Sequence, residues 1–314
     1  MKRTFEFVLV LTVLAISTAA AQDRAAFPEH RGPYLALGDS DPFGYNQFLT
    51  NLAAAAYGLP PTIPLPDVLL SYSGYPQDVS ELLKLDLTNA SCPGQTSSGF
   101  LYYPAPVLEP DNGCDQWRAA GLPLFVTYAS VSETQEKYAT SFLAAHRDTR
   151  LVTITIGGDD LLVLQATCGG SESCVEAGLP GVLLRFTTNL TDIYTGIRST
   201  GYDGPIVAVN YASPDYTKTG ETETDAVSAL NSAILSVTEL FGGKVADVFS
   251  AFKLASGAEG LPCAVGLSFF TPPSGPGCDV HPTPLGQLVI GQLVLKTLGE
   301  DRFPVGFSQL RDNY

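Results

Sequence analysis

Short apolar strands alternate with helical segments along this chain, and the alternation restricts the folds open to it. The clearest strand is Leu-Val-Thr-Ile-Thr-Ile-Gly-Gly at 151–158, which is rich in β-branched residues and is closed by two glycines. Further strands are predicted at 33–40, 83–89, 205–210 and 244–249, and helices at 133–147, 183–199, 221–241 and 285–298. Because such alternation is typical of a parallel sheet covered on both faces, we predict an α/β fold, a three-layer α/β/α sandwich with a central parallel sheet of about five strands in flavodoxin-like order.

The composition is that of an acidic globular protein. Hydrophobic residues make up 45 % of the 314 residues, which is enough to bury a sizeable core, and 32 Asp plus Glu oppose 17 Lys plus Arg for a net charge of −15. Binding to phosphate backbones depends on clustered Lys and Arg, so this excess argues against nucleic acid as a partner. No repeat or low-complexity linker divides the chain, and we expect a single domain over 22–314.

The N terminus has the pattern of a secretory signal peptide. Lys2 and Arg3 precede an apolar run at 5–16, and the small residues at 17–21 follow it. The run is shorter than the ~20 residues that a membrane-spanning helix needs, although an N-terminal anchor is the alternative. We predict that 1–21 is a signal peptide and that the mature protein is secreted, extracellular or periplasmic, with no stable membrane anchor.

All six cysteines lie in the predicted mature part, which agrees with export to an oxidising compartment. Sequence alone does not fix their pairing. Pairing of near neighbours closes three short loops and is the hypothesis that we adopt: Cys92 with Cys114, Cys168 with Cys174, and Cys263 with Cys278.

We expect no metal and no organic cofactor. A zinc site is the alternative use of the cysteines, but no C-x-x-C pair occurs and the three histidines are not suitably spaced. Glu221, Glu223 and Asp225 resemble a calcium-binding cluster. At the start of a helix, however, acidic residues are ordinary partners of the helix dipole, and we interpret them in that way.

Polar side chains and glycines follow the predicted strands where each one ends. Ligands bind beyond the carboxyl ends of the strands in open α/β sheets, so we expect these segments to meet at one edge. They are Gly38-Asp39-Ser40, Asn89 with Cys92-Pro93-Gly94, Gly157-Gly158-Asp159-Asp160, and Asp279-Val280-His281-Pro282. A hydroxyl, an imidazole, carboxylates and flexible backbone are the groups that nucleophilic acyl transfer needs. The Pro-, Gly- and Ser-rich stretch 256–284 is expected to be a loop that shapes the binding surface.

In this order the four segments resemble the sequence blocks of the SGNH (GDSL-type) hydrolases, in particular the secreted bacterial lipases and esterases. Gly38-Asp39-Ser40 is similar to the first block, 89–96 to the second, 157–161 to the third and 279–282 to the last. One block alone arises by chance, but the ordered set spans 34–290, nearly all of the predicted mature chain. The near-neighbour cysteine pairs also look like those of the secreted lipase branch.

The resemblance implies a role for each matching residue. Ser40 matches the nucleophile and His281 the base that takes its proton, and Asp279 would be the acid that orients the histidine. Backbone N–H groups of Ser40 and Gly94 would hold the oxyanion, and Asp159 occupies the third oxyanion position.

Three positions depart from the family pattern. Asp41 stands where Leu is usual, at a position whose side chain does no chemistry. Asp159 stands where the family has an Asn whose amide donates to the oxyanion. An ionised carboxylate only accepts, so Asp159 would have to be protonated to help. Asp279 lies two residues before His281, whereas three is commoner and Cys278 occupies that place, so a backbone carbonyl is the alternative orienting group.

These features predict a secreted serine esterase or lipase that hydrolyses small-molecule or lipid carboxylic esters through an acyl-enzyme. The same blocks occur in carbohydrate O-deacetylases and phospholipases, which the sequence does not separate from a lipase. A degenerate relative that binds a glycan or lipid without turning it over is the remaining alternative, and Asp159 is the residue that points to it.

Overall fold

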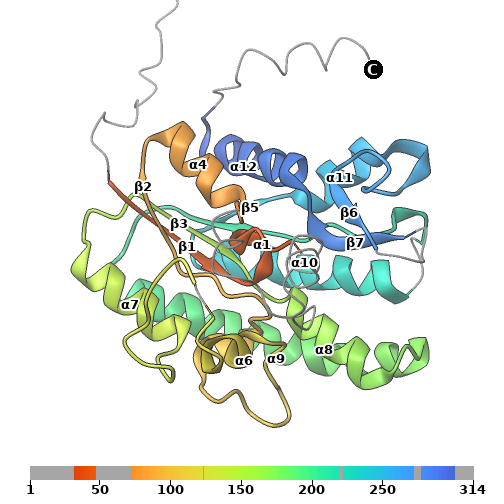
Figure 1. Ribbon diagram of the computed structural model, residues 1–314, viewed down its shortest axis with the longest axis horizontal. Helices are drawn as coiled ribbons and strands as arrows, with labels where there is room; N and C mark the ends of the chain where they lie inside the picture. Colours follow the sequence, from red (N-terminus) through yellow and green to blue (C-terminus); the bar gives the residue numbers. More distant parts are fainter. Residues whose placement is uncertain (1–31, 47–71, 123, 219–221, 272–276, 301–314) are drawn as a thin grey trace, which may run out of the picture. The chain divides into compact units, whose positions relative to one another are not determined.

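The structure is a computed structural model that describes residues 32–46, 72–122, 124–218, 222–271 and 277–300 (Figure 1). The predicted signal peptide, 1–21, lies outside the described residues.

A five-stranded parallel sheet forms the centre, as the sequence predicts. Its strands are β1 (Pro33–Gly38), β2 (Asp86–Asn89), β3 (Leu151–Thr155), β4 (Ile206–Val209) and β5 (Lys244–Ala246), in the flavodoxin-like order β2-β1-β3-β4-β5. β1 pairs with β2 on one side and with β3 on the other. The strand order reverses direction at β1, so the carboxyl ends of β1, β2 and β3 surround the switch point, where sheets of this kind bind ligands.

Helices lie on both faces of the sheet, and a separate antiparallel pair of strands lies near its carboxyl edge (Figure 1). The pair consists of β6 (Ser268–Phe270) and β7 (Cys278–Pro282). The described helices are α1 (Ser40–Phe43), α4 (Tyr75–Leu83), α5 (Ser97–Leu101), α6 (Cys114–Ala119), α7 (Gln135–Ala145), α8 (Gly158–Cys168), α9 (Glu172–Ser199), α10 (Thr222–Leu240), α11 (Val248–Ser256) and α12 (Pro284–Leu298), with short 3₁₀ turns at Tyr216–Lys218 and Gly257–Glu259.

Alternate side chains of the strands enter two apolar cores, one on each face of the sheet. On one face, Leu35, Val152 and Ile206 are buried under α7, α9 and α10. On the opposite face, Tyr34 and Val207 are buried under α4, α11 and α12. Because the middle of the sheet is covered on both sides, every residue of β3 and β4 is buried, with no exposed alternate positions. The two cores hold the sheet rigid beneath its carboxyl edge.

Several elements differ from their predicted bounds or form. The strand predicted at 244–249 ends at Ala246 and helix α11 begins at Val248, and the strand predicted at 83–89 begins only at Asp86, after α4 has ended. α9 begins at Glu172, well before the predicted start at 183, and Pro180 lies inside it. Val175 and Val182 are both buried, so the packing of this helix continues across Pro180. The stretch 256–284 is not only a loop, because β6 and β7 pair within it and the disulfide Cys263–Cys278 closes it.

The three disulfides are those of the near-neighbour hypothesis: Cys92–Cys114, Cys168–Cys174 and Cys263–Cys278. Cys168 ends α8 and Cys174 lies in the first turn of α9, so their disulfide links these two helices. None of the helices in the described ranges combines the length and the apolar character that crossing a membrane requires.

Candidate active site

Ser40 lies just beyond the carboxyl end of β1, in the first turn of α1. β1 ends at Gly38, whose φ is +126°, and a Cβ there would lie 1.9 Å from the carbonyl oxygen of Thr155 on β3. Asp39 caps α1, because its Oδ1 accepts the backbone N–H of Asp41 at 3.0 Å. The close approach of the two strands and the capped turn hold Ser40 at the edge of the sheet.

His281 and Asp279 lie on β7, and the structure brings both to Ser40. Nε2 of His281 lies 3.1 Å from Oγ of Ser40, and Nδ1 lies 2.6 Å from Oδ1 of Asp279. The same carboxylate oxygen accepts the backbone N–H of His281 at 2.8 Å. Residues two apart in a strand project from the same face, so the two-residue spacing lets the acid reach the ring.

Asp279 is the ionised member of this group. Burial acts to raise the pKa of Asp279, but hydrogen bonds from His281 and the charge of its ring outweigh it and hold that pKa below its ordinary value. The carboxylate therefore accepts a proton-bearing Nδ1, and the Nε2 lone pair faces the hydroxyl of Ser40. A hydroxyl next to an imidazole oriented in this way can lose its proton and act as a nucleophile.

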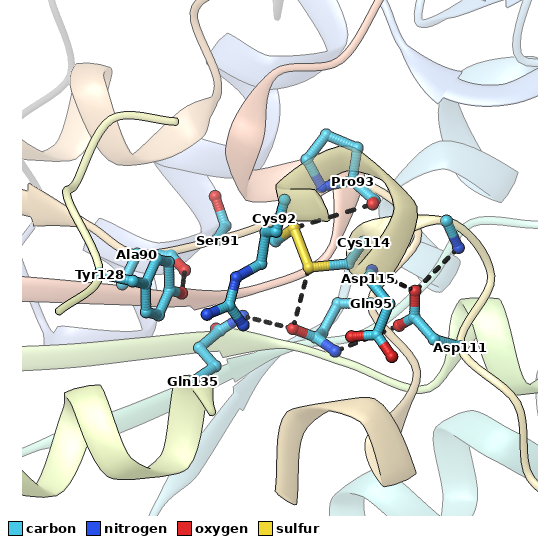
Figure 2. Close-up of a disulfide and its surroundings, with 12 residues drawn as sticks. Ala90, Ser91, Cys92, Pro93, Gln95, Asp111, Cys114, Asp115, Tyr128 and Gln135 are labelled. Carbon is cyan, nitrogen blue, oxygen red and sulfur yellow. Dashed lines mark hydrogen bonds between the residues drawn. A yellow bond between two sulfur atoms is a disulfide. The ribbon is translucent and has the colours of Figure 1, made fainter. Parts of the chain in front are cut away.

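Gly94 lies on the turn after β2, against the loop that carries Asn112. Its φ is +80°, and a Cβ there would lie 2.5 Å from the carbonyl oxygen of Asn112. The backbone N–H of Asn112 donates to the carbonyl oxygen of Gly94 at 2.9 Å. The disulfide Cys92–Cys114 joins the same two segments (Figure 2). Only glycine allows the backbone at position 94 to come this close to the Asn112 carbonyl. The close contact holds the turn in the wall of the cavity that Ser40 also lines.

Asp159 lies in the first turn of α8 and is only 5 % exposed. Its Oδ1 accepts the side-chain N–H of Asn112 at 2.7 Å. Burial and the charge of Asp39 raise the pKa of Asp159 well above its ordinary value, against the bond from Asn112 and the charge of His281, which act to lower it. Asp159 is thus a carboxyl whose surroundings favour the neutral form.

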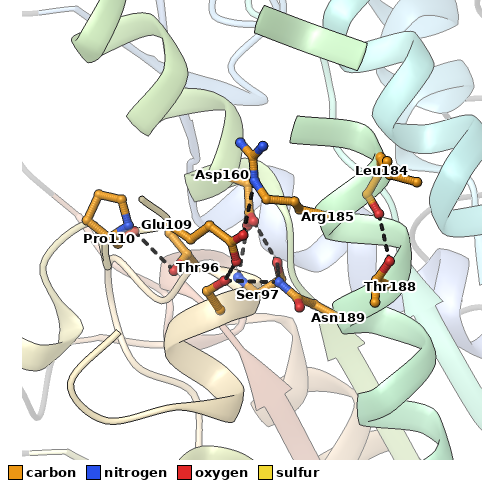
Figure 3. A network of polar contacts seen from close by, with 10 residues as sticks. Thr96, Ser97, Glu109, Pro110, Asp160, Leu184, Arg185, Thr188 and Asn189 are labelled. Atoms are coloured by element: carbon orange, nitrogen blue, oxygen red, sulfur yellow. Dashed lines mark hydrogen bonds and ion pairs between the residues drawn. The ribbon is translucent and has the colours of Figure 1, made fainter. Parts of the chain in front are cut away.

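Asp160 ties α8 to α5 and to the middle of α9. Its two carboxylate oxygens accept the backbone N–H of Ser97 at 2.9 Å and the hydroxyl of Ser97 at 2.6 Å (Figure 3). The amide of Asn189 donates to the same hydroxyl at 3.0 Å. Burial raises the pKa of Asp160 to about 6, although the bonds from Ser97 act to lower it. This network fixes the helix that carries Asp159.

Carboxyls with raised pKa values gather around Ser40. Burial and the charge of Asp41 raise the pKa of Asp39 well above its ordinary value. Burial and the charges of Asp159 and Asp279 raise the pKa of Asp41 to about 8. The folded protein therefore holds protons that the unfolded chain releases, and these groups stabilise the fold most at acid pH.

We expect the melting temperature to fall by several °C between about pH 5 and about pH 9. A carboxyl with a raised pKa contributes stability that is fully present below the unfolded pKa and is lost as the pH rises through the folded value. Asp279, whose pKa is lowered, acts in the opposite sense, and its contribution is lost only as the pH falls into the acid range.

Thermal unfolding followed by circular dichroism measures this dependence. Asp41→Asn is expected to flatten the curve around pH 8, where that carboxyl titrates. Asp148→Asn makes the same change of charge at an exposed site and is expected to leave the slope unaltered. A melting temperature that rises with pH over this interval contradicts the raised pKa values.

Two cavities meet at Ser40, and Asp159 lines both. One has a largely apolar wall formed by Leu161, Leu162, Val227, Leu230 and Val280, with the carboxyls of Asp39, Asp41 and Glu223 at its margin. The other is lined by the site residues and by a mixed wall that includes Tyr45, Asn112, Gln116 and Trp117. A ligand that reaches Ser40 therefore has an apolar compartment on one side and a more polar compartment on the other.

Sequence reasoning missed three side chains that shape this site. Asn112 bonds to Asp159, the ring of Tyr45 lies 5.0 Å from the ring of His281, and the hydroxyl of Tyr211 donates to Oδ2 of Asp39. The sequence feature that could have pointed to Asn112 is weak: it lies two residues before Cys114, which forms a disulfide beside the site. Asp41, whose side chain the family pattern treats as inert, also lines the apolar cavity.

The metal-site alternatives find no support in the part of the chain that the structure describes. No group of three or more His, Cys, Asp or Glu side chains there has the arrangement of a metal site. Glu223 and Asp225 lie in the first turn of α10, in agreement with the helix-dipole interpretation, and Glu221 lies outside the described residues.

Comparison with known proteins gives structural matches only. A scan against family models gives no match, and neither does a comparison with curated proteins. Among solved structures, phospholipase A1 from Streptomyces albidoflavus NA297 is similar with 20 % identity, over 87 % of this chain and 100 % of that chain, at a TM-score of 0.51. An extracellular lipase from Streptomyces rimosus matches with 18 % identity, over 85 % and 99 %, at 0.51. A variant of an acetyl xylan esterase from Geobacillus stearothermophilus matches with 13 % identity, over 87 % and 97 %, at 0.52.

The strand order and these matches define the class of fold. The chain has the fold of the SGNH (GDSL-type) hydrolases, with the five-stranded parallel sheet between two layers of helices.

Proposed function

We propose that this protein is a secreted serine esterase or lipase that hydrolyses carboxylic esters through an acyl-enzyme. One observation carries the proposal, namely that Ser40 Oγ lies 3.1 Å from His281 Nε2 while Asp279 Oδ1 lies 2.6 Å from the other ring nitrogen. This is the arrangement by which a hydroxyl is activated for attack on a carbonyl carbon.

The proposed reaction has two halves. Ser40 Oγ attacks the ester carbonyl while His281 takes its proton, and His281 then gives that proton to the departing alcohol, which leaves an acylated Ser40. Water, deprotonated by His281, attacks the acyl carbon and releases the acid. Asp279 stays ionised throughout and stabilises the protonated ring. The backbone N–H groups of Ser40 and Gly94 are the proposed donors to the oxyanion.

The cavities support an ester with an apolar acyl group. The apolar wall beside Ser40 suits a hydrocarbon chain, and the more polar cavity suits the alcohol portion. The similar proteins are named as a phospholipase A1, a lipase and an acetyl xylan esterase, all of them ester hydrolases. The apolar compartment favours an esterase or lipase over an O-deacetylase, whose acyl group is only an acetyl. The signal-peptide pattern and the three disulfides support secretion.

Covalent labelling tests the proposal directly. A serine-directed fluorophosphonate is expected to add one phosphonyl group to the wild-type protein, read by intact mass, because the reagent reacts with a hydroxyl that a base has activated. Ser40→Ala is the control and is expected to remain unlabelled. A wild-type protein that takes up no label, and hydrolyses no ester in a panel of p-nitrophenyl esters, is a binding protein and not an enzyme of this kind.

A further inference from the structure

Asp159 and Asn112 together occupy a third position beside the two proposed backbone donors. Both side chains line the cavity that Ser40, Gly94 and His281 also line. Oδ1 of Asp159 accepts the side-chain N–H of Asn112 at 2.7 Å. Among the described residues, the hydrogen bonds of this carboxyl use Oδ1, which leaves Oδ2 for a ligand in the cavity.

We propose that Asp159 acts as a neutral carboxylic acid that donates a hydrogen bond from Oδ2 to the oxyanion, and that Asn112 positions it by occupying Oδ1. The inference rests on the acyl-enzyme function proposed above. The amide nitrogen of Asn112 only donates, so it faces the oxygen that lacks the proton, and the acid proton is confined to Oδ2. The proton stays on Asp159 during the reaction, and only the strength of its hydrogen bond changes as the oxyanion forms. Carboxylic acids kept neutral by their surroundings serve as oxyanion donors in enzymes.

The charged groups around Asp159 favour this form. Burial and the charge of Asp39 raise its pKa well above the ordinary value, and the charge of Asp160 acts in the same direction. The groups that act against them are the bond from Asn112, the ring of His281 and the N terminus of α8. Three further carboxyls lie on the adjoining elements, Asp41 on α1, Glu223 on α10 and Asp279 on β7. The phenol of Tyr211, which lines the same cavity, donates to Asp39, and α6, whose Gln116 and Trp117 line the other cavity, carries Arg118.

Asn112 is held firmly enough to impose this arrangement. Its backbone N–H donates to the carbonyl oxygen of Gly94 at 2.9 Å. On the other side, the carboxylate of Asp111 accepts the backbone N–H groups of Gly113 at 2.9 Å and Asp115 at 2.8 Å (Figure 2). The disulfide Cys92–Cys114 closes the same segment. Asn112 thereby couples the backbone donor at Gly94 to the side-chain donor at Asp159.

The test is the pH profile of kcat/KM for p-nitrophenyl butyrate, followed at the isosbestic wavelength of p-nitrophenol from about pH 5 to about pH 9. In the wild type we expect an alkaline limb, where Asp159 loses its proton. Asp159→Asn keeps a donor at every pH, so its alkaline limb is expected to disappear while the plateau stays within about tenfold of wild type. Asp159→Ala removes the donor and is expected to lower the plateau by about 10²–10³-fold.

Asn112→Ala separates positioning from a merely structural role. Its plateau is expected to fall by roughly tenfold, because the acid proton is no longer confined to Oδ2. Its alkaline limb is expected to move to higher pH, because the lost hydrogen bond favoured the charged form of Asp159. Val107→Ala, at a 94 % exposed position on the same loop, is the matched control and leaves both quantities unchanged.

Three results overturn the inference. They are wild-type activity in Asp159→Ala, a profile of Asp159→Asn that superimposes on the wild type, and a loss in Asn112→Ala as large as that in Asp159→Ala with an unmoved limb. The last result would make Asn112 itself the donor. Fluorophosphonate labelling of every variant separates these results from failure of the proposed function, in which the wild type neither takes up label nor turns over ester.

Discussion

Alanine at Ser40 or at His281 is expected to lower kcat for ester hydrolysis by on the order of 10⁶, and alanine at both positions is expected to cost no more than either alone. The reason is the contact between Oγ and Nε2 at 3.1 Å. A hydroxyl without its base and a base without its hydroxyl are equally unable to attack an ester, so the two losses overlap.

The measurement is the turnover of one ester by wild type, both single variants and the double variant. Purified protein must show the wild-type circular dichroism spectrum, which excludes loss by misfolding. Losses that add in free energy mean that Ser40 and His281 act independently, and that result removes the basis of the acyl-enzyme mechanism.

Asp279→Asn is expected to lower kcat by about 10⁴-fold while the protein keeps its fold. An asparagine has nearly the same shape, but its N–H₂ group can meet Nδ1 as a donor, and the ring then carries its proton on Nε2, where it cannot accept the proton of Ser40. Loss of the negative charge also removes the stabilisation of the protonated ring.

Asp148→Asn, the exposed substitution with the same change of charge, is the control for this experiment. The pH profile of kcat gives a second readout. A variant whose histidine has the wrong tautomer is expected to lose kcat at every pH at which the wild type is active. Activity of Asp279→Asn close to wild type would show that a backbone carbonyl, and not this carboxylate, orients His281.

The sheet could be predicted from the sequence because the residue types in its strands indicate that they are buried. Four of the five residues from Leu151 to Thr155 are β-branched and all five are buried, as expected of a strand covered on both faces, and helical periodicity between the strands indicates the parallel arrangement. The segments that carry Ser40, Gly94 and Asp159 could be predicted to converge, since the carboxyl ends of parallel strands share one edge. That argument does not place His281, which lies on β7 in the separate antiparallel pair.

The partners of those residues could not be predicted, because they come from segments without periodicity. Asn112 lies on an irregular loop that a disulfide draws against the turn at Gly94, and no local pattern states which side chain it will meet. The early start of α9 at Glu172 was missed as well, because tertiary packing of Val175 and Val182 continues the helix on both sides of Pro180. Local propensities contain no information about contacts between segments distant in sequence or about tertiary packing that extends a helix.

The tether between Cys92 and Cys114 has a consequence for where the protein works. It joins the turn that holds Gly94 to the loop that holds Asn112, so we expect reduction of this disulfide to loosen the cavity wall beside Ser40. If the protein is exported as proposed, we expect that wall to reach its final form only in a compartment where cysteines are oxidised.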